Sequence, residues 1–306
     1  MTLNFTTDPT KNISIITATK RASRPIVSGK PKEIAACPFC PGCENNTPKQ
    51  TIALPDSKNW KVRGFKNKFG FLSPSKNPLK KPIGHAFGYH EVIVTSNRHG
   101  QLFQDYSLDH LKLVFDAWKQ RFLALSNKQD VSCVYLFANH GPKAGASIDH
   151  EHCQITALSF SPKIIMDEID YSKKNSCIYC KMTKEAKIKV AENKHFVAVC
   201  PKFQRFAYET WIIPKEHLLS FDEINEVKGE ALMEILSKSI AKIYPISPNY
   251  NLAFHQSTKN GKLHFHIEIY PRKDNWAGFE LGTGIIVNTT DEKKSVAALK
   301  AANLAN

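Results

Sequence analysis

Cysteine and histidine residues recur in the same order in the two halves of this chain. Each half has a Cys-x-x-Cys pair, then a segment ending in histidine, then a His-x-His motif. Two thiolates and two imidazoles form a closed tetrahedral zinc site, so the spacing predicts two structural Zn²⁺ ions. The expected ligands are Cys37, Cys40, His99 and His150 in the first half, and Cys177, Cys180, His217 and His264 in the second.

Two alternatives to these ligand sets stay open. A Cys-x-x-Cys pair can be redox-active instead of binding a metal. A rival metal site in the second half would leave its cysteine pair unused. Its ligands would be Glu168, His255, His264 and His266.

The segment His150-Glu-His152-Cys-Gln154 is the most specific local signal. Alternate residues of a strand share a face, so the two histidines and the glutamine are expected to point the same way. If His150 holds a metal, His152 is fixed next to it. A neutral imidazole attacks phosphorus well and also leaves well, which suits a covalent nucleotidyl intermediate. Upstream, the small-residue loop from Asn139 to Ser147, including Gly141, suits phosphate binding through its backbone N–H groups.

The chemistry is expected in the first half only. Glu268 stands in the second half where Gln154 stands in the first. We therefore interpret His264 as a zinc ligand and His266 as a structural or auxiliary residue.

The elements that position these residues follow from hydrophobic periodicity. Apolar residues at steps of three and four predict amphipathic helices over 107–127 and 222–243. Alternating or apolar runs predict strands before and after each helix. This pattern indicates an α+β fold of two tandem units, with antiparallel strands and a long helix in each. The expected domains are 1–165, which is catalytic, and 166–306, which is degenerate.

Composition bears on the compartment of the protein and on whether it binds nucleic acid. The chain has 306 residues and eight cysteines, no apolar run long enough for a membrane span, and no apolar core of a signal peptide near its start. These features favour the cytoplasm, with thiols rather than disulfides. The net charge of +14 is spread along the chain, without the interleaved aromatics of a nucleic-acid surface. A non-catalytic zinc module that binds nucleic acid remains a remote alternative.

Together these motifs resemble the galactose-1-phosphate uridylyltransferase branch of the histidine-triad superfamily. They are spread over almost the whole chain. One departure is Glu151, which stands where the family usually has proline between its two histidines. The matching motifs are Arg21-x-x-Arg24-Pro, Cys37-Pro-Phe-Cys40-Pro-Gly42, Val62-Arg63…Asn67-Lys-Phe69, Glu91-Val…His99, Asn139-x-Gly141…Ser147-x-x-His150-x-His152-x-Gln154, His264-Phe-His266 and Gly278-Phe279-Glu280.

The resemblance implies a role for each matching residue. His152 would be the nucleophile, and Gln154 would hold the nucleotidylated intermediate. The substrate-contacting residues would be Ser147 and Asn139 at the phosphate and leaving group, Arg21 and Arg24 at phosphate, Asn67 in the nucleotide pocket and Glu280 at the sugar hydroxyls. The family's habit of dimerising implies a homodimer.

The implied reaction is transfer of UMP from UDP-glucose to galactose 1-phosphate. Gln154 supports transfer over hydrolysis, because a third histidine could activate water and glutamine cannot. An ADP-glucose phosphorylase of the same branch is the nearest alternative. The sequence does not distinguish uracil from adenine.

Overall fold

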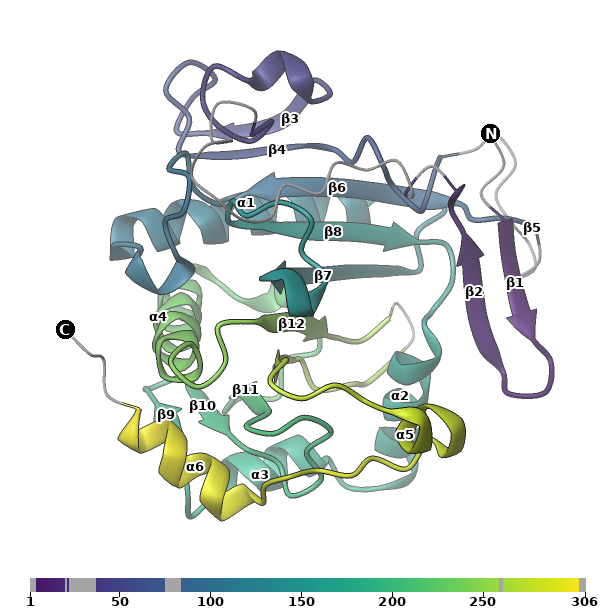
Figure 1. The fold of residues 1–306 in the computed structure, drawn as a ribbon, viewed down its shortest axis with the longest axis vertical. Helices are drawn as coiled ribbons and strands as arrows, with labels where there is room; N and C mark the ends of the chain where they lie inside the picture. Colours follow the sequence, from purple (N-terminus) through teal and green to yellow (C-terminus); the bar gives the residue numbers. More distant parts are fainter. Residues whose placement is uncertain (1–3, 20, 22–36, 75–83, 259–260, 303–306) are drawn as a thin grey trace.

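The computed structural model describes residues 4–19, 21, 37–74, 84–258 and 261–302. Its main element is one ten-stranded sheet, joined by a smaller three-stranded sheet (Figure 1). The first half contributes β3 (Gln50–Leu54), β4 (Val62–Lys66), β6 (Gly88–Val94), β7 (Cys133–His140) and β8 (His152–Leu158). The second half contributes β9 (Ala191–Glu192), β10 (Phe196–Val199), β11 (Thr210–Pro214), β12 (Tyr250–His255) and β13 (His266–Pro271). The small sheet contains β1 (Asn4–Asp8), β2 (Ile13–Thr17) and β5 (Gly84–His85).

The strand order of the large sheet is β3-β4-β6-β8-β7-β12-β13-β11-β10-β9. Neighbouring strands are antiparallel throughout. The two sets of five strands meet where β7 pairs with β12, for example Asn139 with Asn251. The sequence predicted the antiparallel strands of each half, and the β7–β12 pairing places both halves in one continuous sheet.

Two long helices, α1 (Leu108–Ser126) and α4 (Glu226–Ile243), pack together against one face of this sheet. Each begins at a side-chain cap: Ser107 accepts from the His110 backbone, and Asn225 accepts from that of Lys228. Their close approach requires Gly229, because a Cβ there would lie 2.5 Å from the Phe115 ring. The helix predicted over 107–127 is confirmed. The second begins at 226 rather than 222, because Phe221–Glu223 form a separate 3₁₀ turn.

Shorter helices cover other parts of the molecule. They are α2 (Lys163–Lys174), α3 (Ile178–Glu185), α5 (Gly278–Thr283) and α6 (Glu292–Ala301), with 3₁₀ turns at Glu44–Asn46, Phe103–Asp105 and Pro142–Ala144. The boundary expected between residues 165 and 166 lies within α2. No helix in the described part of the chain is both long and apolar enough to cross a membrane.

Candidate active site

A cavity of about 550 Å³ opens on the face of β4, β6 and β8 opposite α1. Strand alternation separates the two faces: Val92 of β6 lines the cavity, whereas Glu91 forms an ion pair with Arg121 of α1, at 2.7 Å. The cavity walls are Arg21, Pro38, Phe39, Asn45, Asn46, Thr47, Pro48, Phe65, Asn67, Lys68, Phe69, Val92, Asn139, Gly145, Ala146, Ser147, Ile148, His152 and Gln154. The fold thus brings most of the expected substrate-contacting residues to one place.

A hydrogen bond to the backbone fixes the proton on one ring nitrogen of His152. Its Nδ1 lies 2.7 Å from the His150 carbonyl oxygen, and a carbonyl only accepts, so Nδ1 carries the proton. The lone pair is therefore on Nε2, the other nitrogen of a ring that lines the cavity. Burial lowers the pKa of His152, which keeps the imidazole neutral near pH 7.

The prediction that His150 and His152 lie on one face of a strand is wrong. β8 begins at His152, and His150 lies in the bend before it. Its ring is 2% exposed and contacts cysteine sulfurs, while its backbone oxygen holds His152. His150 thus contacts both a cysteine–histidine cluster and His152.

Other predicted substrate residues also surround the cavity. Arg21 donates to the Phe69 carbonyl oxygen at 3.1 Å and lies over the Phe71 ring. Asn139 accepts from Asn251 of β12 at 2.8 Å, so the second half helps to position it. Gly141 is not a wall residue but shapes the loop, with φ +79° and no room for a Cβ beside Asn249. Arg24 lies outside the described residues.

Four backbone N–H groups of the loop predicted to bind phosphate are paired within the protein. The backbone N–H groups of residues 144–146 donate to carbonyl oxygens of the loop itself, and that of Lys143 donates to Asn249. These four donors are already paired. Side chains such as Ser147 and Arg21 are therefore better placed to bind phosphate than these N–H groups.

The first cysteine–histidine cluster is assembled as predicted. His150 Nδ1 lies 3.6 Å from Cys37 Sγ and 3.7 Å from Cys40 Sγ, and His99 Nδ1 lies 3.6 Å from Cys40 Sγ. His150 Nε2 lies 2.8 Å from the Ser96 carbonyl oxygen and carries the proton, which leaves Nδ1 free to bind a metal. Burial and the neighbouring Cys37 sulfur raise the pKa of Cys40 to about 12, so a cation would be needed to hold Cys40 as a thiolate near neutral pH.

The second cluster has the same arrangement. His264 Nδ1 lies 3.5 Å from Cys177 Sγ and 3.4 Å from Cys180 Sγ, and His217 Nδ1 lies 3.2 Å from Cys180 Sγ. His264 Nε2 faces the Pro214 carbonyl oxygen at 3.0 Å. Both clusters could hold a metal ion, since all ligand atoms within each lie within 4.8 Å of one another.

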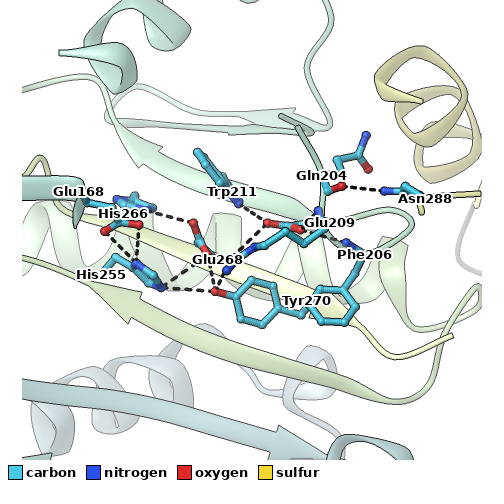
Figure 2. Close-up of polar contacts among 11 residues, drawn as sticks. Glu168, Gln204, Phe206, Glu209, Trp211, His255, His266, Glu268, Tyr270 and Asn288 are labelled. Carbon is cyan, nitrogen blue, oxygen red and sulfur yellow. Dashed lines mark hydrogen bonds and ion pairs between the residues drawn. The ribbon is translucent and has the colours of Figure 1, made fainter. Parts of the chain in front are cut away.

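The rival ligand set does not form with His264, which lies with the thiols. Glu168, His255 and His266 instead gather around Glu268, as Figure 2 shows. His255 Nδ1 lies 3.0 Å from Glu168, and His266 Nε2 lies 3.3 Å from Glu268. Each of these four residues also offers a ligand atom within 4.8 Å of the others.

This second-half cluster is closed to substrate. His266, which corresponds to His152, is fully buried, and the Tyr179 ring stacks on it at 4.1 Å. Glu268 also accepts from Arg205. It accepts from the Tyr270 hydroxyl as well (Figure 2). The charges of His255, His266 and Arg205 lower the pKa of the buried Glu268 carboxyl far below its usual range. A buried carboxylate compensated in this way suits a structural role.

Glu280 lies apart from the cavity. It is on α5, in the lower half of Figure 1 near α2, whereas β4, β6 and β8 are in the upper half. Side chains of these three strands line the cavity, and Glu280 is not among its walls. Its carboxylate accepts from the Ala277 N–H at 2.9 Å. Within one chain, the structure does not bring Glu280 to the other predicted substrate residues.

The chain is similar to known proteins over nearly its whole length. An ADP-glucose phosphorylase from Arabidopsis thaliana, solved with bound ADP-glucose, superposes with a TM-score of 0.80 at 27% identity, over 98% of this chain and 99% of that one. In sequence, ADP-glucose phosphorylase of Arabidopsis thaliana is 29% identical over 92% of this chain and 88% of its own length. Galactose-1-phosphate uridylyltransferase of Thermotoga maritima is 26% identical over 94% of both chains.

Over nearly its whole length, the chain thus has the α+β fold of a known class of enzymes. A family model described as galactose-1-phosphate uridyl transferase, N-terminal domain, matches residues 12–162, and a domain of unknown function, DUF4921, matches residues 89–302. Residues 12–162 thus match the galactose-1-phosphate uridylyltransferase N-terminal domain, and nearly the whole chain is similar to galactose-1-phosphate uridylyltransferases and ADP-glucose phosphorylases.

Sequence reasoning missed two groups around these sites. His90 lies behind Gln154 at 2.9 Å, and alternation along 90–94 with Val92 was the signal that could have found it. Tyr179 and Arg205 close the second-half cluster, but they come from segments distant from His266 in sequence. No local pattern could have indicated that contact.

Proposed function

We propose that this protein transfers a nucleoside monophosphate from a nucleotide sugar to a phosphorylated acceptor through a covalent nucleotidyl-His152 intermediate. The observation that carries the proposal is the paired state of His152: its Nδ1–H is bound to the His150 carbonyl, and its ring lines a cavity of about 550 Å³. UMP, UDP-glucose and galactose 1-phosphate are the proposed group, donor and acceptor. They follow the uridylyltransferase relatives.

The reaction would run in two displacements at one phosphorus atom. His152 Nε2 attacks the α-phosphorus, an N–P bond forms, and the P–O bond to the sugar phosphate breaks. A second sugar phosphate then attacks the same phosphorus, and the N–P bond breaks. Arg21 and Ser147, both lining the cavity, would stabilise charge on the transferring group.

Gln154 favours transfer over hydrolysis. It lines the cavity two residues after the nucleophile, and a carboxamide cannot act as a general base toward water. A sugar phosphate is already a good nucleophile and a good leaving group, so it needs no proton shuttle.

Zinc is the proposed metal of both cysteine–histidine clusters. Zn–S bonds of about 2.3 Å and Zn–N bonds of about 2.0–2.1 Å, at a tetrahedral angle, place sulfur and nitrogen about 3.6 Å apart. The sulfur–nitrogen distances are 3.6–3.7 Å in the first cluster and 3.2–3.5 Å in the second. With four protein ligands each, the ions would hold loops to the sheet and take no part in the transfer.

ADP-glucose phosphorylase is the second candidate, with AMP as the transferred group and inorganic phosphate as acceptor. The ADP-glucose phosphorylase relatives, at 29% and 27% identity, support it as well as the uridylyltransferase supports the first candidate. The two candidates share every step at His152.

Labelling would separate these candidates. The protein is incubated with UDP-glucose or ADP-glucose labelled at the α-phosphate, without acceptor, and acid-labile label on the protein is counted. We expect label from UDP-glucose that galactose 1-phosphate discharges. Label from ADP-glucose that inorganic phosphate discharges would establish the second candidate. No label from either donor on metal-replete protein would contradict the proposed function and return attention to the nucleic-acid alternative.

We also propose that residues 1–165 and 166–306 are two copies of one histidine-triad-like unit. The palindromic strand order supports this division, since five strands of the first half are followed by five of the second in reverse order. In the second copy His266 is fully buried, so the first copy would carry the chemistry.

A homodimer would bring Glu280 to the sugar. Around it α5 exposes apolar side chains, with Phe279 at 55% and Leu281 at 72%, as expected of a face that another copy covers. We expect sedimentation to give twice the 34.5 kDa chain mass. Mixing inactive Glu280→Ala chains with inactive His152→Gln chains should restore part of the activity. A monomer with full activity would contradict this arrangement.

A further inference from the structure

A buried histidine lies directly behind Gln154. His90 of β6 is 4% exposed, and its Nε2 lies 2.9 Å from Gln154 Oε1. On the other side of the ring, the backbone N–H of Phe71 lies 3.4 Å from Nδ1. Asn67 Nδ2 approaches the same place, 3.1 Å from His90 Nε2 and 3.4 Å from Gln154 Oε1.

The Phe71 backbone determines which nitrogen of His90 carries the proton. A backbone N–H can only donate, so Nδ1 must be the unprotonated nitrogen. Burial lowers the pKa of His90 to about 4, so near neutral pH the ring has a single proton, on Nε2. Nε2–H then donates to Gln154, and the group of Gln154 that faces it must be the oxygen.

A second backbone donor orients Asn67 in the same sense. The Phe69 N–H donates to Asn67 Oδ1 at 2.9 Å, which turns Nδ2 of that amide toward His90 and Gln154. His90 and Asn67 therefore both direct donors at Gln154 Oε1. A carboxamide oxygen has two lone pairs and can accept both.

The opposite end of the Gln154 carboxamide is left for the substrate. Among the residues that the structure describes, none accepts from Gln154 Nε2, and Gln154 is a wall of the cavity that holds His152. Its NH₂ group can donate to oxygens of a transferring phosphoryl group. In the flipped orientation its oxygen would face those phosphoryl oxygens and repel them.

We propose that His90 is a positioning residue for nucleotidyl transfer, which fixes the Gln154 carboxamide with its NH₂ group directed at the nucleotidyl group on His152. This inference rests on the proposed function. The backbone N–H groups of Phe71 and Phe69 orient the side chains of His90 and Asn67. These two side chains in turn orient the carboxamide of Gln154. His90 itself touches no substrate in this arrangement.

The inference is tested by substitutions of His90 that keep or remove a hydrogen-bond donor at the position of Nε2. His90→Gln can still donate to the Gln154 oxygen, whereas His90→Asn is too short and His90→Leu has no donor. We expect kcat to fall about 10- to 100-fold in the Asn and Leu variants with little change in KM, since one preorganised donor to developing charge contributes about 10²–10³. His90→Gln should recover most of the rate. Equal rates in all three variants would overturn the inference.

A double-mutant cycle with Gln154→Ala separates positioning from a general structural role. If His90 acts through Gln154, His90→Asn should lower kcat by less than about 2-fold when Gln154 is already alanine. A loss as large as in the wild-type background would overturn the inference. Melting temperatures of all variants identify any that are unfolded, and the Gln and Asn pair keeps the comparison valid if the Leu variant does not fold.

One measurement does not depend on activity. Nitrogen-15 NMR of histidine-labelled protein, assigned by loss of a signal in His90→Gln, should show His90 neutral at pH 7 with the proton on Nε2. A proton on Nδ1 would overturn the inference even in an active enzyme. A wild-type protein that takes no label from any nucleotide sugar but has the expected tautomer would instead refute the proposed function and leave the oriented amide in place.

Discussion

His152→Gln is expected to abolish covalent labelling and to lower the rate of transfer by about 10⁴-fold or more, as loss of a nucleophile does. Glutamine is close to histidine in size, but its amide does not attack phosphorus. Rate is measured by exchange of labelled sugar 1-phosphate into the nucleotide sugar, which requires both displacements. Nucleotide-sugar binding should change little, because the residues proposed to contact the phosphate and the base are other walls of the cavity.

His266→Gln is the matched control for this variant. The two histidines have the same local geometry, since His266 Nδ1 also contacts the carbonyl two residues earlier, at 3.0 Å. His266 is fully buried under Tyr179, so the control should label and turn over like wild type if it folds. Label lost in the His266 variant and kept in the His152 variant would mean that the second half carries the chemistry.

Loss of one cysteine from a proposed zinc site is expected to have the second largest effect. Metal analysis should find two zinc ions per chain in wild type, and one in either Cys40→Ser or Cys180→Ser. The free energy of unfolding should fall by several kcal/mol in both, since structural zinc contributes about 10–16 kcal/mol in zinc-finger peptides. Cys40→Ser should also lose most of the activity, because His150 is a proposed ligand of the same metal and its carbonyl oxygen contacts His152 Nδ1.

Cys43→Ser is the control, since Cys43 lies in the same loop but belongs to neither cluster. It should keep both metal ions and full activity. A redox role for the Cys-x-x-Cys pairs predicts a different result. The purified protein would then hold no zinc, and its activity would depend reversibly on a thiol reductant.

Both cysteine–histidine clusters could be predicted from the sequence because metal ligands must follow strict chemistry. Only a few residue types bind zinc, and a Cys-x-x-Cys spacing already places two of them on one turn. Likewise, hydrophobic periodicity was sufficient for α1, α4 and most of the strands, since a helix or strand with one buried face repeats its apolar residues at a fixed interval.

The orientation of the Gln154 carboxamide could be inferred only from the tertiary structure. The sequence indicated His152 and Gln154 but not that the Phe71 backbone, through His90, determines which end of the Gln154 amide faces the cavity. Hydrogen-bond direction depends on atoms that meet only after β4, β6 and β8 have paired.

Long-range contacts also determine that His266 of the second half is buried. Its sequence repeats the motifs of the first, and Glu268 in place of Gln154 indicated only a difference. The fold then covers His266 with Tyr179 of α3 and pairs Glu268 with Arg205. The sequence thus determined which residues could bind metal or attack phosphorus. Only tertiary packing, which brings segments distant in sequence over each histidine, decided which one remains open to substrate.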